Sequence, residues 1–181
     1  AEHHLNSLLE KLKFEGKISN VIKPPKRWGI PLRPLNKTYG NRVVVVGDAA
    51  GQAKPTTGGG IYYALLSADK AAETISNGLL KNDLGVTVLR QYEKKWKSIL
   101  AKELRIGYYA RRLYEMLNDN QLDELFKTIT VNGIHDKLIN DPNLSFDWHG
   151  NLIIKALSFK LISKMIRAST PISTILNSRI L

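Results

Sequence analysis

The sequence predicts an α/β fold that is mostly helical and contains a few strands. Two observations predict it: apolar residues recur at helical spacing through most of the chain after residue 60, and a run of four valines occupies residues 43–46. Consecutive β-branched residues are typical of a strand covered on both faces, as in a parallel sheet layered with helices. We therefore expect a buried parallel strand at 43–46, followed by packed helices.

The first forty residues are expected to contain a helix, a strand and a rigid connection. Four leucines lie on one side of a helix predicted over residues 2–13: Leu5, Leu8, Leu9 and Leu12. Gly16 should end this helix, and residues 17–22 should form a strand. Four prolines follow, at Pro24, Pro25, Pro31 and Pro34. Proline forbids a regular helix and restricts sheet pairing to edges, so this stretch is predicted to be an extended crossover.

The rest of the chain is predicted to be helical. Residues 60–79 carry apolar side chains at helical spacing and many small residues, which let the helix pack closely. Residues 88–117 predict one long helix or two helices joined near Gly107. Two further helices are predicted over residues 122–129 and 151–167, with a turn-rich segment at 140–150 between them.

The composition excludes several classes of function. The chain has 181 residues, a net charge of +11, no cysteine and four histidines. Without cysteine, neither a disulfide framework nor a cysteine-based zinc site can form, and the histidines make no pair at ligand spacing, so no metal is expected. No apolar segment reaches the roughly 18 residues that a membrane span needs. The positive charge suits an anionic nucleic acid, lipid or cofactor, or is simply a basic surface.

The residues after the valine run are candidates for ligand binding. Gly47 and Asp48 follow the predicted strand, and ligands bind at the carboxyl ends of parallel strands in open α/β sheets. The Asp48 carboxylate can accept hydrogen bonds from a sugar or ribityl hydroxyl, while Gly47 and Gly51 let the backbone come close. The alternative is that Asp48 is a turn residue that caps a helix.

A glycine-rich loop precedes the helix predicted to start near residue 60. Residues 55–60 are Pro-Thr-Thr-Gly-Gly-Gly. A helix N-terminus offers unpaired N–H groups, and glycines remove every Cβ that would hold a planar ligand away. These N–H groups could stabilise negative charge on the pyrimidine edge of a reduced flavin. The alternative is a flexible linker; a P-loop is not expected, because the Gly-Lys-Ser/Thr ending is absent.

Three strings together resemble the second FAD-contacting region of geranylgeranyl reductases, which belong to the para-hydroxybenzoate hydroxylase-like flavoproteins. They are residues 29–34 (GIPLRP), 43–51 (VVVVGDAAG) and 55–64 (PTTGGGIYYA). Residues 102–112 (KELRIGYYARR) and 121–126 (QLDELF) resemble the C-terminal helices of the same family. The resemblance covers most of the chain, and its specific part is the flavin segment.

The resemblance implies the fold of a C-terminal fragment of an FAD-binding, Rossmann-like flavoprotein. It divides the chain into the end of a substrate-side domain with the crossover (1–40), an FAD-binding strand, loop and helix (41–80), and a helical region (81–181). The cofactor contacts that it implies are Gly47, Asp48, Pro55, Gly58, Gly59, Gly60 and Ile61. Arg33, Tyr62 and Tyr63 are the candidate substrate contacts, with surface arginine and core tyrosines as the alternatives.

The implied function is FAD-dependent reduction of C=C double bonds in the geranylgeranyl chains of isoprenoid, archaeal-type membrane lipids. The electron donor would be NAD(P)H or ferredoxin, and the catalytic residues are not identified. A related FAD-dependent monooxygenase or halogenase is the second reading. The third is a non-enzymatic basic module that binds anionic lipid or nucleic acid, although lysine and arginine are spread along the chain without a nucleic-acid recognition motif.

One departure from the family affects what the chain can do. Its members begin with an ADP-binding βαβ unit that carries a glycine fingerprint, and no G-x-G-x-x-G follows a predicted strand in this sequence. Either the chain is a piece of a longer protein, or it lacks half of the usual FAD site. We expect a piece, which by itself binds FAD poorly and is inactive.

The last segment of the chain is basic and apolar. Residues 151–181 contain no Asp or Glu, and their cations are Lys155, Lys160, Lys164, Arg167 and Arg179. This pattern suits peripheral contact with a membrane by an otherwise cytoplasmic protein, or a core-packing helix with a basic outer edge.

Overall fold

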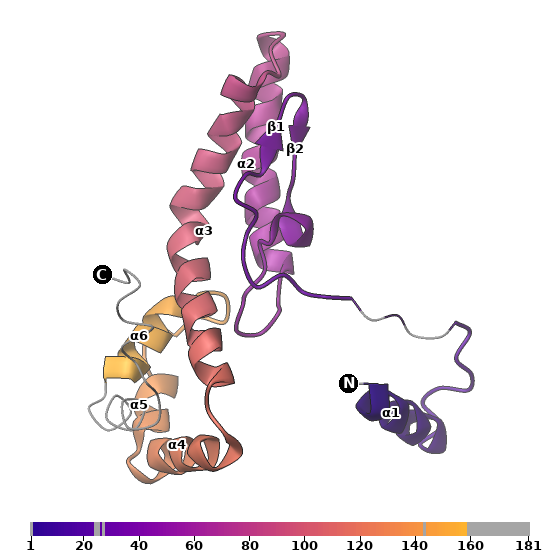
Figure 1. Ribbon diagram of the computed structural model, residues 1–181, viewed down its shortest axis with the longest axis vertical. Helices are drawn as coiled ribbons and strands as arrows, with labels where there is room; N and C mark the ends of the chain where they lie inside the picture. Colours follow the sequence, from indigo (N-terminus) through magenta and orange to yellow (C-terminus); the bar gives the residue numbers. More distant parts are fainter. Residues whose placement is uncertain (1, 24–25, 27, 143, 159–181) are drawn as a thin grey trace.

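The computed structural model describes residues 2–23, 26, 28–142 and 144–158, and this part of the chain is mostly helical with one two-stranded sheet (Figure 1). The predicted fold class is confirmed. The elements, in chain order, are α1 (Glu2–Phe14), β1 (Tyr39–Gly40), β2 (Val43–Val44), the 3₁₀ turn η1 (Gly47–Ala50), α2 (Ile61–Leu80), α3 (Val86–Glu115), α4 (Asp119–Val131), α5 (Ile134–Ile139) and α6 (Gly150–Ser158).

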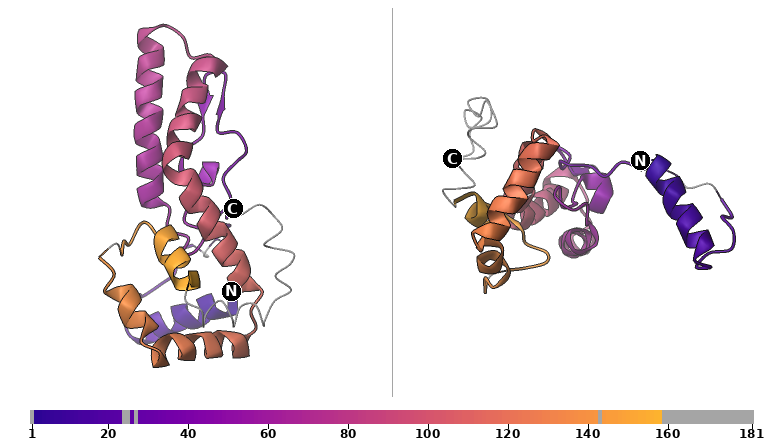
Figure 2. Two further views of the ribbon diagram at one scale, coloured as in Figure 1. Left: turned by 90° about the vertical axis from the view of Figure 1, so that its left-hand side faces the viewer. Right: turned by 90° about the horizontal axis from the view of Figure 1, so that it is seen from below.

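The core lies between α2 and α3, which run side by side and are joined by a tight turn (Figures 1 and 2). The α3 side chains of the core recur every four residues and therefore share one face of the helix. The core consists of Tyr63 and Ala71 from α2 and of Tyr92, Trp96, Leu100 and Leu104 from α3. α3 is one continuous helix, and Gly107 does not interrupt it.

The valine run is not a buried parallel strand, and that prediction was wrong. Val43 and Val44 form β2, which pairs antiparallel with β1, with Tyr39 opposite Val44. Two residues connect the strands, and so short a connection permits only antiparallel pairing. Val44 and Val46 pack against the core, whereas Val43 is 55% exposed. The run is therefore exposed at Val43 and only partly buried from Val44 to Val46.

The N-terminal helix ends as the sequence predicts. Gly16 adopts a positive φ of 66°, and the amide of Lys17 donates to the carbonyl of Leu12 at 2.9 Å. This is a glycine-terminated helix end, in which the left-handed residue carries no Cβ penalty. The strand predicted at 17–22 is absent, because these residues turn and bend and pair with no other strand in the described part of the chain.

Hydrogen bonds tie the end of the crossover to α3, while Pro24, Pro25 and Arg27 of the predicted extended segment lie outside the described residues. Glu93 accepts from the backbone amide of Thr38 at 2.8 Å and from its hydroxyl at 3.2 Å. The same hydroxyl accepts from the indole N–H of Trp96 at 2.8 Å. Burial alone would raise the pKa of Glu93, but the bonds from Thr38 and the ammonium of Lys97 lower it overall. The crossover is thereby fixed along α3.

The C-terminal region contains two predicted helices and one that was not predicted. Asn118 and Gln121 form a reciprocal capping box at the start of α4, which fixes that helix start. The short helix α5 was missed. α6 begins at Gly150, within one residue of the predicted start, and residues 159–181 of the predicted helix and basic tail lie outside the described residues. Among the described helices, none has the length and apolar character to span a membrane.

Candidate functional site

The glycine-rich loop is a closed turn that presents its backbone at the start of α2. The amide of Lys54 donates to the carbonyl of Gly59 at 3.0 Å, and the amide of Gly58 donates back to the carbonyl of Lys54 at 2.8 Å. Gly58 has a φ of 75°, which an L side chain rarely adopts. The loop is therefore a defined structure, and the flexible linker that the sequence left open as an alternative is excluded.

The N-terminus of α2 has no side-chain cap. Gly60 is the N-cap residue and supplies no side chain, and the next residue, Ile61, is 83% exposed. The first N–H groups of an α-helix have no partner within the helix, and the helix dipole adds partial positive charge there. This end of α2 can accept an electron-rich group.

Asp48 lies beside this helix start. A Cβ at Gly60 would overlap Oδ1 of Asp48, so only glycine permits their contact. The Asp48 carboxylate is exposed and has no hydrogen-bond or ion-pair partner among the described residues. The structure thus brings together Asp48 and Gly60, which the sequence proposed for the same site, with the carboxylate turned to solvent.

A buried glutamine holds the Gly47–Asp48 turn in place. Gln52 accepts from the amide of Gly47 at 2.7 Å and donates to the Tyr92 hydroxyl at 3.0 Å, which donates in turn to the carbonyl of Val45 at 2.8 Å. Gln52 was not among the sequence candidates. A glutamine in a Gly-rich turn gives no sign of burial, because its partner is forty positions away.

The two tyrosines after the glycines lie in different environments. Tyr63 is buried in the core, and its hydroxyl donates to the carbonyl of Asp147 at 2.8 Å. Burial, with the nearby carboxylate of Glu103, raises the pKa of Tyr63. Tyr62 is 38% exposed and meets the ring of Trp148 edge-on, with centroids 6.0 Å apart. Of the two, Tyr62 is placed to touch a ligand.

The segment 145–150 packs against the glycine-rich loop through Lys54. The Lys54 ammonium bonds the Asp147 carboxylate at 2.6 Å and the Phe146 carbonyl at 3.0 Å, and only 6% of this lysine side chain is exposed. The aromatic rings of Phe146 and Tyr63 lie 4.9 Å and 5.6 Å from the ammonium. We call residues 145–150 the clasp.

Two more contacts fasten the clasp. His149 Nε2 donates to the carbonyl of Phe146 at 2.8 Å, which leaves Nδ1 to accept from the Thr56 hydroxyl at 3.0 Å. Glu103 accepts from the amides of His149 and Gly150, at 2.6 Å and 2.7 Å, and so caps α6. The sequence did not single out Lys54, Thr56 or Glu103, and the distance along the chain to their partners hides the pattern.

Pro55 and Arg33 occupy the other side of the loop. Pro55 is buried and packs against Gly107 of α3. Arg33 is exposed, and its guanidinium lies 4.6 Å from the centre of the Tyr108 ring. Its backbone carbonyl is so close to Gly51 that a Cβ there would overlap it. Arg33 therefore contacts the Gly47–Gly51 turn by its backbone and α3 by its side chain.

The fold is that of part of a geranylgeranyl reductase-like protein. The structure is similar to the crystal structure of a geranylgeranyl bacteriochlorophyll reductase-like protein from Thermoplasma acidophilum, with a TM-score of 0.57 and 24% identity. The match covers 75% of this chain and 32% of that one. No family model matches the chain.

Two curated reductases are similar to this chain in sequence. The chain is 38% identical over 96 residues to a digeranylgeranylglycerophospholipid reductase of Methanocaldococcus jannaschii, which covers 53% of this chain and 25% of that protein. It is 32% identical over 134 residues to the reductase of the same name from Methanococcus vannielii, covering 73% of this chain and 34% of that protein. The resemblance to the geranylgeranyl reductase family is confirmed, and the chain spans about a third or less of these relatives' length.

Proposed function

We propose that this chain forms the flavin-ring side of an FAD-dependent oxidoreductase that reduces C=C double bonds in the geranylgeranyl chains of isoprenoid membrane lipids. The observation that carries the proposal is the uncapped start of α2, bordered by Gly58–Gly60 and by the unpartnered Asp48 carboxylate. The names of the relatives support the reductase activity and the lipid substrate. Residues 41–80 would contact FAD, and the preceding and following residues would border the substrate.

The residues around α2 suit the ring side of FAD. The N–H groups at the α2 start can donate to the pyrimidine edge of the ring and stabilise negative charge there. Gly59 and Gly60 present backbone without side chains, so a planar ring can approach closely. Asp48 can accept hydrogen bonds from ribityl hydroxyls. Reduced FAD, when bound, supplies the hydride, with NAD(P)H or ferredoxin as the source of electrons.

The side chains next to the α2 start suit an apolar substrate. Ile61 is exposed, and the Tyr62 ring packs edge-on against the Trp148 ring. An aliphatic and an aromatic surface therefore border the glycine-rich loop. These residues would hold a prenyl chain against the ring and exclude water from it. The clasp holds this region through Asp147, which accepts hydrogen bonds from the Tyr63 hydroxyl and the Lys54 ammonium.

Exchange of Asp48 tests the proposal in the intact protein. Asp48→Ala should weaken FAD binding about tenfold, since a hydrogen bond to a charged group contributes about 1.5 kcal/mol or more. Asp69→Ala is the matched control, because Asp69 is an exposed carboxylate on α2 whose partner is the neighbouring Lys70. FAD affinity is measured by the fluorescence change of the flavin on binding.

Reduction is measured separately on digeranylgeranylglycerophospholipid under reducing, oxygen-free conditions. Mass spectrometry should show a gain of two hydrogen atoms for each reduced double bond, at a rate that falls in Asp48→Ala and not in Asp69→Ala. A protein that binds FAD equally well with and without Asp48, or that leaves the lipid unreduced, would contradict the proposal.

A further inference from the structure

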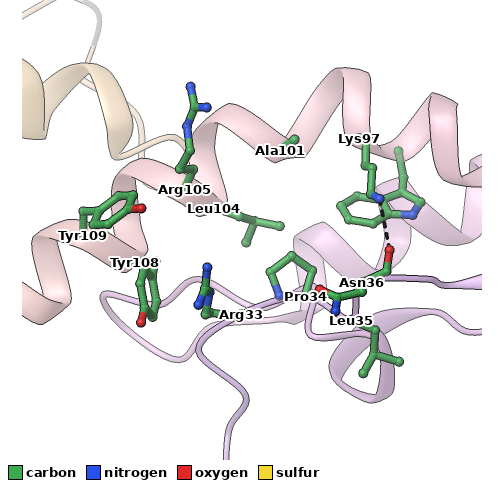
Figure 3. Close-up of a pocket in the computed structure, with 11 residues that line it drawn as sticks. Arg33, Pro34, Leu35, Asn36, Lys97, Ala101, Leu104, Arg105, Tyr108 and Tyr109 are labelled. Carbon is green, nitrogen blue, oxygen red and sulfur yellow. Dashed lines mark hydrogen bonds between the residues drawn. The ribbon is translucent and has the colours of Figure 1, made fainter. Parts of the chain in front are cut away.

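A cavity of about 500 Å³ lies between the crossover and α3, away from the α2 start (Figure 3). Trp96 and Leu104, both buried, line it from α3, and Pro34 and Leu35 line it from the crossover. The cavity is therefore apolar where the two segments meet. A hydrocarbon chain can lie against Pro34 and Leu35, the accessible members of this group.

The polar residues that line this cavity are rich in cations. Arg33, Lys97 and Arg105 are among them, and no Asp or Glu side chain lines it. Lys97 is paired with Glu93, at 3.0 Å, whereas Arg33 and Arg105 have no carboxylate partner among the described residues. The cavity thus carries uncompensated positive charge, which favours an anion.

Arg33 is the cation best placed to hold an anion. Its guanidinium carbon lies over the Tyr108 ring, 4.6 Å from the centroid, in a cation–π contact. Its side chain donates no hydrogen bond to any described residue, so its N–H groups are free to bind oxygen atoms in pairs, the geometry that suits phosphate. Figure 3 shows Arg33 between Pro34 and Tyr108, whereas the Arg105 side chain extends from α3 away from Arg33.

The crossover connects this cavity to the glycine-rich loop. Three residues before Arg33, the Ile30 side chain lies against Gly58, so close that a Cβ on the glycine would clash with it. Trp28, Ile30 and Leu35 are large apolar side chains exposed along the same segment. The crossover therefore carries exposed apolar side chains at both places: Leu35 lines the cavity, and Ile30 lies beside the glycine-rich loop.

We propose that the cavity is the site for the phosphate group of the lipid substrate, with Arg33 as its ligand. The apolar chain then lies along the crossover toward the glycine-rich loop. This inference rests on the proposed reductase function, because reduction requires the prenyl chain to point toward the proposed flavin site. A nucleotide such as NADP⁺ carries the same phosphate chemistry, and the experiment separates the two sources.

Direct binding to the intact protein tests the site without catalysis. Oleoyl lysophosphatidic acid is titrated against monooleoylglycerol, its phosphate-free counterpart, by calorimetry. Arg33→Gln should weaken binding of the phosphorylated lipid about tenfold and leave the neutral lipid unaffected, because a single charge-assisted contact is lost. Arg33→Lys should be intermediate, because it keeps the charge and loses the paired N–H groups.

Arg90→Gln is the matched control, since Arg90 is an exposed arginine on α3, about 20 Å along the helix from Arg105. It should bind both lipids as the unsubstituted protein does. Equal loss of phosphorylated and neutral lipid in Arg33→Gln would overturn the proposal. So would NADP⁺ that displaces lysophosphatidic acid and whose own binding depends on Arg33, since the cavity would then belong to a nucleotide.

Kinetic measurements distinguish a failure of this phosphate site from a failure of the proposed reductase function. With geranylgeranyl phosphate and geranylgeraniol as substrates, Arg33→Gln should raise KM about tenfold for the phosphate alone and leave kcat unchanged for both. If the protein reduces neither compound, the proposed function fails, and the lipid titration still decides whether the cavity binds phosphate. If both are reduced and Arg33→Gln does not distinguish them, the phosphate site fails and the reductase function stands.

Discussion

Lys54 is a charged residue whose side chain is almost completely buried. Its ammonium lies between the Asp147 carboxylate and two aromatic rings, while Asp147 itself keeps contact with solvent. A buried charge depends on its partner, because removing the partner leaves the charge without compensation. The two members of this ion pair should therefore not be equivalent.

We expect Asp147→Asn to destabilise the protein more than Lys54→Met does. Asp147→Asn leaves a buried ammonium with weaker acceptors and should cost about 3 kcal/mol, whereas Lys54→Met leaves a carboxylate that can reach water and should cost about 1 kcal/mol. Urea unfolding followed by tryptophan fluorescence measures the free energies of unfolding. The reverse order of the two variants would show that Asp147, rather than Lys54, is the buried charge.

At this scale the sequence predicted residues whose role depends on their immediate neighbours. Gly58 and Gly60 stand out in the sequence because a run of three glycines precedes a predicted helix, and the structure places Asp48 beside Gly60. Lys54 and Gln52 were not predictable. Their environments are set by Asp147 and Tyr92, which lie far along the chain, and nothing local marks either residue as buried.

Among the elements, the contact of the crossover with α3 depends on one carboxylate. Glu93 accepts two hydrogen bonds from Thr38 and pairs with Lys97. The pKa of this carboxyl is lower in the folded protein than the ordinary value of 4.5. The folded state therefore favours the ionised form, and this contribution to stability is present above the unfolded pKa of about 4.3.

The contribution of Glu93 should disappear as the pH falls through its folded pKa, below 4.5. At pH 7 we expect Glu93→Gln to lower the free energy of unfolding by about 1–2 kcal/mol, and at about pH 3 the difference should shrink. Denaturant unfolding at the two pH values measures it. Glu73→Gln serves as the control, because Glu73 is an exposed partner of Lys95, and it should show little difference at either pH. A Glu93 effect that is independent of pH would contradict the linkage.

Helices were predicted better than strands for a physical reason. The apolar residues of α2 and α3 recur at helical spacing along consecutive residues, so the pattern is visible in the sequence itself. Whether β2 pairs parallel or antiparallel depends on the strand beside it. Four valines indicate a strand, but they do not show which strand pairs with it or whether one of its faces is exposed to solvent. α5, with six residues, is too short to show a period.

On the scale of the whole molecule, α1 stands apart. It has no buried residue, and Figures 1 and 2 show it separated from the α2–α3 pair and the C-terminal helices. α3 contacts β1, β2, α2 and α6, and α5 packs against both α4 and α6. The stability of the described part of the chain is therefore centred on α3.

Deleting residues 1–23 from the chain should change the free energy of unfolding by less than about 0.5 kcal/mol, because no apolar side chain of α1 is buried. Thermal unfolding followed by near-ultraviolet circular dichroism measures it. Deleting residues 145–158, which removes the clasp and α6, should lower stability clearly and provides the comparison. A large loss on removing α1 would mean that this helix packs on the core in solution.

The clasp has a consequence for the order in which the protein is made. Lys54, Thr56 and Tyr63 are anchored by residues that follow them by more than eighty positions. While the chain is being synthesised, the glycine-rich loop leaves the ribosome long before Asp147 and His149 exist. The loop can therefore reach its final shape only after the C-terminal helices have emerged, since contacts so distant in sequence form late. A ribosome that stalls before residue 147 would hold a chain with both core helices complete and the ring-facing loop still unfastened.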